Sequence, residues 1–296
     1  MVNFNNEILV VENISKTIDK KIILNGITFS MRQGDILGIV GPNGSGKTTL
    51  LTAISGILKI DKGQISIADE IKLGALIDEP IFYDHLTGYE NLKLVGKIRN
   101  INISKPDILD ILEKVNLKND ANKKFKNYSY GMRQRLGIAG AIFNNANLVI
   151  LDEPTNGVDP MGIRDIREII QKLNYEGKTF IVTSHNLSEI EIICSHLLIL
   201  KEGNVIFGGL ITDLQKSNNT TNVELGCENM KNLREEILKM PKFIEIIKEN
   251  EEFIIISVMN DISLAEVNSW CYEHNINLSR LRIFKDDLES KVLDLL

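Results

Sequence analysis

The run Gly41-Pro42-Asn43-Gly44-Ser45-Gly46-Lys47-Thr48 satisfies the pattern G-x-x-x-x-G-K-[ST], which is typical of phosphate-binding loops. Glycines let successive backbone N–H groups converge on phosphate oxygens, and a helix that follows directs its partly positive N-terminus to the same place. Lys47 is expected to neutralise the β- and γ-phosphates, and the Thr48 hydroxyl is expected to reach Mg²⁺. The sequence therefore predicts a site for ATP and Mg²⁺ over residues 41–49, which includes Thr49.

Two acids and a histidine follow further apolar runs. Asp152 and Glu153 come directly after Leu148–Leu151, and His185 comes just past Thr179–Thr183. In open α/β sheets ligands bind at the carboxyl ends of the strands. We expect Asp152 to hold Mg²⁺ through water, Glu153 to act as general base on an attacking water, and the His185 imidazole to bond to the γ-phosphate or that water.

The elements that must position these residues read as a parallel α/β sheet. Asp35–Val40, Leu148–Leu151 and Thr179–Thr183 are nearly unbroken apolar runs, as in strands buried on both faces. The phosphate-binding run directly follows the first of them and precedes a helical run, Thr49–Leu58. Residues from about 82 to 145 read as helical, which predicts a helical subdomain inserted into the α/β core.

A second domain is expected after residue 216. The polar run Lys216–Asn222 is a plausible linker, so we place one domain at 1–216 and a second at 217–296. The expected order of the second domain is βαββαβ, which suggests a split-βαβ sandwich. Its predicted elements are strand Val223–Cys227, helix Asn229–Met240, strands Phe243–Lys248 and Phe253–Val258, helix Ile262–His274 and strand Leu278–Phe284. The alternative is that this segment is a flap that only stabilises the first domain.

Composition excludes several classes of protein. The chain has 296 residues, 43% of them hydrophobic and 25% charged, which is ordinary for a protein that buries a core and stays in water. No run approaches the roughly 20 apolar residues of a membrane span, and the first residues do not resemble a signal peptide, so we expect a cytoplasmic protein.

The net charge of -6 arises in residues 217–296, which hold 9 Lys and Arg against 15 Asp and Glu. No basic face for nucleic acid is therefore evident. The three cysteines are interpreted as small buried side chains.

A further motif lies between the phosphate loop and Asp152. Tyr128-Ser129-Tyr130-Gly131-Met132-Arg133-Gln134-Arg135-Leu136 resembles the signature of ABC ATPases. With Leu151–Pro160 and His185 it completes the elements of that family in family order, over about residues 7–210. The resemblance implies a P-loop NTPase cassette of ABC type with a small α+β accessory domain.

The same resemblance implies a head-to-tail dimer of two such subunits. In the family each ATP lies between one subunit's Lys47 and the other's signature, so Ser129, Tyr130, Gly131, Met132 and Gln134 are expected to face the partner's ATP. Physically, Ser129 and Gly131 open a helix whose N-terminus can bind a γ-phosphate. Asp159, in Thr155–Pro160, occupies the position of the family's D-loop.

Two positions depart from the general family pattern. Asp78 stands where most members have Gln, and an acid there is similar to the bacitracin-type and lantibiotic-immunity exporters. We expect it to coordinate Mg²⁺. Alignment on Lys16 places Ile18 where most members stack an aromatic ring on adenine. Because an apolar side chain cannot stack, we expect weaker and less selective binding of the base.

The motifs together resemble the ATPases of antibiotic and lantibiotic exporters. This implies an enzyme that hydrolyses ATP, dimerises around two Mg-ATP and moves a separate transmembrane permease, peripheral on the inner face of the cell membrane. The expected cargo is an antimicrobial peptide or antibiotic. Two alternatives stay open: a soluble ABC ATPase acting on DNA or ribosomes, and a nucleotide-sensing module with little turnover.

Overall fold

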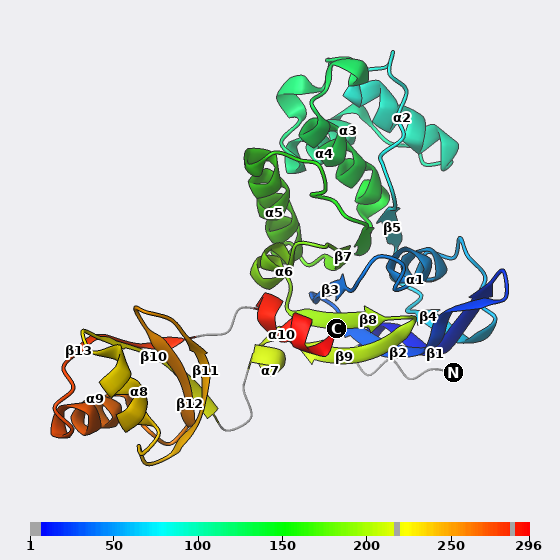
Figure 1. Cartoon of the computed structure of the whole chain (residues 1–296). Helices are drawn as coiled ribbons and strands as arrows, with labels where there is room; N and C mark the ends of the chain where they lie inside the picture. The colour runs from blue at the N-terminus through cyan, green and yellow to red at the C-terminus, as the bar shows by residue number, and fades with distance from the viewer. Residues whose placement is uncertain (1–6, 216–219, 285–287) are drawn as a thin grey trace. The chain divides into compact units, whose positions relative to one another are not determined.

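The computed structural model describes residues 7–215, 220–284 and 288–296 (Figure 1). The chain divides into two compact units, the first comprising residues 1–211 with Leu295–Leu296 and the second Thr212–Asp294. The expected boundary at 216/217 therefore lies slightly beyond the observed one. The last two residues also group with the first unit, where the sequence placed them in the second.

The first unit contains two sheets. The six-stranded sheet has the strand order β5-β6-β7-β3-β8-β9, parallel except for the antiparallel pair β8 and β9. Its strands are β3 (Ile36–Val40), β5 (Leu73–Leu76), β6 (Leu148–Leu151), β7 (Thr179–Thr183), β8 (His196–Lys201) and β9 (Asn204–Leu210). A three-stranded antiparallel sheet, which the sequence did not predict, has the order β2-β1-β4, with β1 (Glu7–Ile18), β2 (Lys21–Arg32) and β4 (Lys62–Ile67).

The six-stranded sheet lies between two hydrophobic cores. In β6, Leu148 and Ile150 enter the core shared with α1 (Lys47–Ile54) and the antiparallel sheet, while Val149 and Leu151 enter the core shared with α5 (Pro160–Tyr175). Successive side chains of a strand point to opposite faces, so a strand covered on both faces must be apolar at every position. This explains the unbroken apolar runs in the sequence. Helix α6 (Leu187–Ile193) follows β7.

The helical subdomain lies between β5 and β6, as predicted, and occupies the upper part of Figure 1. It consists of α2 (Gly88–Ile98), α3 (Lys105–Lys114) and α4 (Tyr130–Ala141), with the short 3₁₀ turns η1 (Lys118–Asp120), η2 (Phe125–Asn127) and η3 (Phe143–Asn145). Helices α2 and α3 begin at capping boxes, Thr87 with Glu90 and Ser104 with Asp107. These caps satisfy free N–H groups and fix where each helix begins.

The second unit runs in the order β10-α8-β11-β12-α9-β13, the order that the sequence predicts. After α7 (Ile211–Gln215) it contains β10 (Thr220–Cys227), α8 (Met230–Ile237), β11 (Phe243–Glu249), β12 (Ile254–Met259), α9 (Leu264–Glu273), β13 (Leu278–Phe284) and α10 (Leu288–Leu295). The sheet is antiparallel with strand order β11-β12-β10-β13, the arrangement of a split βαβ sandwich. It has a hydrophobic core of its own, which includes Val223, Ile256 and Val267.

Two expectations need correction. Part of the predicted linker, Thr220–Asn222, belongs to β10, because that central strand is paired on both sides, with β12 and with β13. Residues 216–219 lie outside the described residues. Of the three cysteines only Cys271 is fully buried, whereas Cys194 and Cys227 are partly exposed at the edges of their cores.

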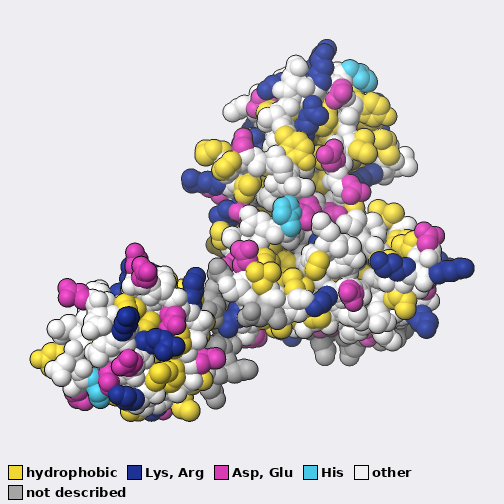
Figure 2. All heavy atoms as spheres, viewed as in Figure 1, with side chains coloured by type: hydrophobic (Ala, Val, Ile, Leu, Met, Phe, Trp, Pro, Cys, Tyr) yellow, Lys and Arg dark blue, Asp and Glu magenta, His cyan; other side chains and the backbone are white. Residues whose placement is uncertain are grey.

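The surface carries charges of both signs. Figure 2 shows acidic and basic side chains interspersed on the visible face of each unit. Within the described ranges, no helix has the length and apolar character needed to cross a lipid bilayer.

Candidate nucleotide site

The loop between β3 and α1 has a backbone that requires its glycines. Gly41, Gly44 and Gly46 have φ angles of 153°, 79° and 104°, in the region that L side chains rarely adopt. A Cβ on Gly41 would lie 2.1 Å from the Leu200 carbonyl oxygen, and one on Gly46 would lie 2.8 Å from the Ile23 carbonyl oxygen. The loop therefore packs closely on the neighbouring backbone at Gly41 and Gly46.

Two polar side chains of this loop fit a phosphate. The Lys47 ammonium donates to the carbonyl oxygens of Gly41 (2.8 Å) and Pro42 (3.2 Å), so it lies across the loop. Ser45 is 3% exposed, and its hydroxyl has no hydrogen-bond partner among the described residues. A buried hydroxyl without a partner is uncommon, and a phosphate oxygen would satisfy it. The geometry suits the phosphate cradle that the sequence predicts.

Asp152 lies beside this loop at the carboxyl end of β6. Its carboxylate is buried and accepts from the hydroxyls of Thr48 (3.0 Å) and Thr183 (2.5 Å), one on each oxygen. Thr48 and Asp152 are thus brought together as the sequence expects for a magnesium site. Carboxylate and hydroxyl oxygens are suitable ligands for Mg²⁺, which usually takes one or two protein ligands and completes its shell with phosphate oxygens and water.

No larger metal cage is present within the part of the chain that the structure describes, where no three or more His, Cys, Asp or Glu side chains cluster. At Thr48 and Asp152, the remaining ligands of a magnesium ion would be water and oxygens of a bound nucleotide.

Glu153 and His185 are in direct contact. The His185 Nδ1 atom lies 2.7 Å from the Glu153 Oε2 atom. The Glu153 side chain is half-buried, and its backbone has a φ of 49°, which is unusual for a residue other than glycine. His185 is 63% exposed, so the imidazole contacts the acid with one nitrogen and keeps its other ring edge toward solvent.

The signature residues begin α4. The Ser129 hydroxyl caps the helix by accepting from the backbone N–H of Met132 (3.3 Å). The Tyr130 hydroxyl accepts from Gln134 (3.2 Å), and its ring lies against Gly157, where a Cβ would be 3.4 Å from it. Nearby, Asp159 caps α5 by accepting from the Gly162 N–H (2.7 Å). The N–H groups at the start of α4 that have no partner within the helix are available for a phosphate.

The two atypical positions are exposed. Ile18 ends β1, opposite Lys21 across the hairpin, and is 40% exposed. Asp78 follows β5, has a φ of 60° and makes no hydrogen bond or ion pair with any described residue. It makes no hydrogen bond with Thr48 or Asp152, and so does not share in the hydrogen-bonded group at the start of α1.

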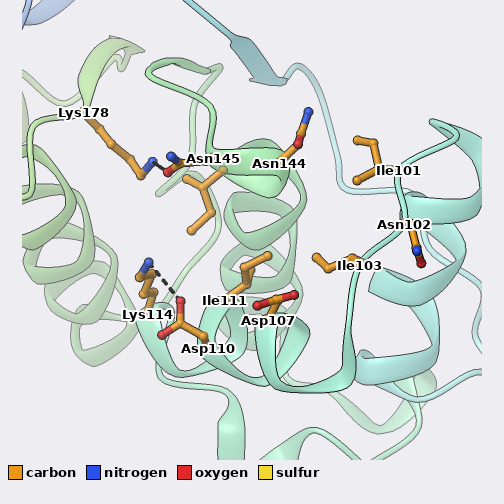
Figure 3. Close-up of a pocket in the computed structure, with 11 residues that line it drawn as sticks. Ile101, Asn102, Ile103, Asp107, Asp110, Ile111, Lys114, Asn144, Asn145 and Lys178 are labelled. Atoms are coloured by element: carbon orange, nitrogen blue, oxygen red, sulfur yellow. Dashed lines mark hydrogen bonds and ion pairs between the residues drawn. The ribbon is translucent and has the colours of Figure 1, made fainter.

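A separate cavity of about 340 Å³ lies at the base of the helical subdomain, and none of its lining residues belongs to these motifs (Figure 3). The Lys178 ammonium donates to the Ala146 carbonyl (2.7 Å) and lies 3.4 Å from the Asn145 side chain. Burial lowers the pKa of Lys178, and nearby Lys114 lowers it further. These contacts join the residue before β7 to the loop before β6, which indicates a structural role.

Thr183 is the residue at this site that sequence reasoning missed. Within an apolar run it reads as one more β-branched strand residue. The available signal was its place as the last residue of the strand, two residues before His185, at the edge of the sheet where the other site residues lie.

The fold and this loop define a P-loop ATPase cassette. The ABC transporter family model matches residues 24–156. The chain is 38% identical over 205 residues to the lantibiotic transport ATP-binding protein SrtF of Streptococcus pyogenes, covering 67% of this chain and 89% of that protein. It is 32% identical over 307 aligned positions to the linearmycin resistance ATP-binding protein LnrL of Bacillus subtilis, covering 97% of both.

Solved structures agree with these relatives. The ADP conformation of MJ1267, an ATP-binding cassette of an ABC transporter, has a TM-score of 0.62 and 29% identity, and the match covers 69% of this chain and 91% of that one. The chain therefore belongs to the ATP-binding proteins of ABC transporters, which are ATPases. The resemblance to exporter ATPases stated from the motifs is confirmed.

Proposed function

We propose that this ATPase dimerises head to tail around two Mg-ATP and drives export of an antimicrobial peptide or antibiotic through a separate membrane subunit. The names of SrtF and LnrL, a lantibiotic transport protein and a linearmycin resistance protein, support the cargo class. The second ATPase subunit would be another copy of this chain. The complex would place the chain on the inner face of the cell membrane.

In this proposal each residue near the γ-phosphate has a separate role. Residues 41–49 bind the phosphates, with Lys47 neutralising their charge. Glu153 accepts a proton from the attacking water, and His185 orients the Glu153 carboxylate through their 2.7 Å contact. Thr48 and Asp152 would hold Mg²⁺, which when bound neutralises charge on the phosphate oxygens.

The second half of each site would come from the partner copy. Ser129 and Gly131, with Tyr130, Met132 and Gln134, form the start of α4, where the helix dipole favours an anion. Because the phosphate loop already uses the N-terminus of α1, the signature is free for the ATP of another subunit. Asp159 lies at the start of the adjacent α5 and would meet the same interface. Asp78, which follows β5, would be a further ligand to Mg²⁺.

The observation that carries the proposal is the contact of Glu153 with His185 next to the Thr48 and Asp152 pair. The substitution Glu153→Gln keeps the size of the side chain and removes the base. We expect ATP binding to persist, ATP turnover to fall by about 10²–10⁴-fold, and the dimer to accumulate in ATP. Steady-state hydrolysis and light scattering with ATP measure these effects.

A matched control is Glu176→Gln, the same change at an exposed position after α5. It should hydrolyse ATP at the parent rate and dimerise only transiently. Hydrolysis by Glu153→Gln at the rate of this control would contradict the role of Glu153 as base.

The alternatives are separated by what co-purifies with the chain. Exporter function predicts a membrane protein that remains bound in detergent. Ribosomes or DNA in the same preparation would favour the soluble ATPase, and a chain that binds ATP without measurable turnover would favour the nucleotide-sensing module.

A further inference from the structure

Thr183 connects the two acids of the site through a single hydroxyl. It is the last residue of β7 and fully buried. Its Oγ1 atom donates to Asp152 Oδ1 at 2.5 Å and accepts from the backbone N–H of Glu153 at 2.8 Å. One side chain therefore contacts the carboxylate of one acid and the backbone of the next.

The pairing of β6 with β7 places Thr183 there. Leu151 and Val182 are register partners in this parallel pair, so Asp152, directly after β6, lies next to Thr183, the last residue of β7. The Asp152 carboxylate then lies between two hydroxyls, with Thr183 on Oδ1 and Thr48 on Oδ2 at 3.0 Å. With both oxygens engaged, the carboxylate cannot rotate without breaking a hydrogen bond.

The second hydrogen bond acts on Glu153. Its backbone has a left-handed φ of 49°, a conformation that costs free energy in a non-glycine residue and persists only where surrounding contacts impose it. The bond from the Glu153 N–H to Thr183 is such a contact. It fixes the backbone from which the Glu153 side chain extends toward His185.

We propose that Thr183 is a positioning residue of the ATPase site, which sets the orientation of Asp152 and the backbone conformation of Glu153 together. The inference rests on the proposed roles of these two acids in binding Mg²⁺ and activating water. Threonine suits this position because its hydroxyl donates and accepts at once, and its branched Cβ restricts rotation about χ1.

The test is Thr183→Val, which keeps the shape and removes the hydroxyl. We expect kcat to fall by about tenfold to a hundredfold, as for a misplaced catalytic group. The ATP dissociation constant should stay within about threefold, because the phosphate loop is untouched, and half-maximal activity should require more Mg²⁺. Thr183→Ser should recover most of kcat. A pure structural role would instead change stability and leave the dependence on Mg²⁺ as it is.

The matched control is Thr179→Val on the same strand. Thr179 is equally buried, and its hydroxyl accepts from the Gly34 N–H (2.9 Å) at the other end of β7. It should show the same loss of stability and the parent kcat. If Thr183→Val does not fold, Thr183→Cys, which retains the volume with a weak donor, should show the same loss of kcat.

The combination with Glu153→Gln separates this inference from the proposed function. If Thr183 acts largely through the base, Thr183→Val should lower turnover much less in the Glu153→Gln variant than in the parent chain. If Glu153→Gln turns over ATP at the parent rate, the proposed base is rejected. If Glu153→Gln is inactive but Thr183→Val or Thr183→Cys is fully active, only the role of Thr183 is rejected. A serine variant as impaired as the valine variant would also overturn it.

Discussion

At the scale of single residues, the phosphate loop and the signature present their polar side chains from different parts of the cassette. Lys47 and Ser45 lie inside the loop that packs on β8 and β2, whereas Ser129 lies at the start of a helix of the inserted subdomain. Under the proposed function, Lys47 and Ser45 bind the nucleotide of their own subunit, and Ser129 meets the nucleotide of a partner copy.

Two substitutions test this division. Lys47→Ala should abolish nucleotide binding, because it removes the ammonium group that lies across the loop and would neutralise the phosphates. Ser129→Arg should leave binding by the monomer intact and block dimerisation, since it replaces a helix cap by a bulky side chain at the proposed interface. Calorimetry with ATP and light scattering measure the two effects. Loss of monomer binding in both variants would contradict the division.

Ile18 leads to a prediction about the base. Its exposed aliphatic side chain at the β1–β2 hairpin offers an apolar contact but no ring. We expect GTP to compete with ATP within about tenfold, or about 1.4 kcal/mol. Ile18→Tyr should tighten binding of both nucleotides through stacking, by about 1–3 kcal/mol. Competition with a fluorescent ATP analogue measures both. A hundredfold preference of the parent chain for ATP would mean that another side chain reads the base.

At the scale of elements, the central strand of the second unit, β10, carries a buried and ion-paired glutamate. Glu224 in β10 has a nearly inaccessible side chain and accepts hydrogen bonds from Arg280 (2.8 Å) and Arg282 (2.7 Å) of β13. Burial acts to raise the pKa of Glu224, but the hydrogen bonds and charges of Arg282 and Arg280 outweigh it, so the net shift is downward from 4.5. The ionised Glu224 carboxylate therefore stabilises the folded state of the second unit.

This shift predicts that the second unit loses stability in acid. Because the pKa of Glu224 is lower in the folded than in the unfolded state, its contribution is present above pH 4.5 and is lost as pH falls through the folded value. Glu224→Gln should destabilise the unit at neutral pH and flatten its acid dependence. The single tryptophan, Trp270 in α9, reports its thermal unfolding. Glu235→Gln, at an exposed position of α8, is the control. An unchanged pH profile in Glu224→Gln would contradict the prediction.

Elements also show what the sequence could and could not predict. The strands β6 and β7 were predictable because both faces are covered, and strand ends then brought Asp152, Glu153 and His185 to one edge. The start of β10 was not, because Thr220–Asn222 are polar and become a strand only through pairing with two neighbours. Thr183 was missed for the opposite reason, since a β-branched residue in an apolar run carries no sign of its hydrogen bonds.

At the scale of the whole molecule, each unit has its own interior. Among the described residues, the two cores of the first unit contain none from the second, and the core of the second unit is built from residues within 223–281. A chain that ends at Lys216 should therefore keep its cassette folded and bind ATP with the parent affinity. Its dimerisation or its pairing with a membrane subunit should change if the second unit is an accessory domain. Circular dichroism and ATP titration test this, and a truncated chain that cannot fold would favour the stabilising flap.

Leu295 and Leu296, at the end of α10, group with the first unit and not with the second. The Lys201 ammonium in β8 donates to the Leu296 carbonyl, so Leu296 lies against the cassette. A fluorophore or affinity tag joined to the last residue would consequently report on the ATPase and would sit beside β8. To follow the second unit alone, a probe has to be attached within its own loops, between residues 228 and 277.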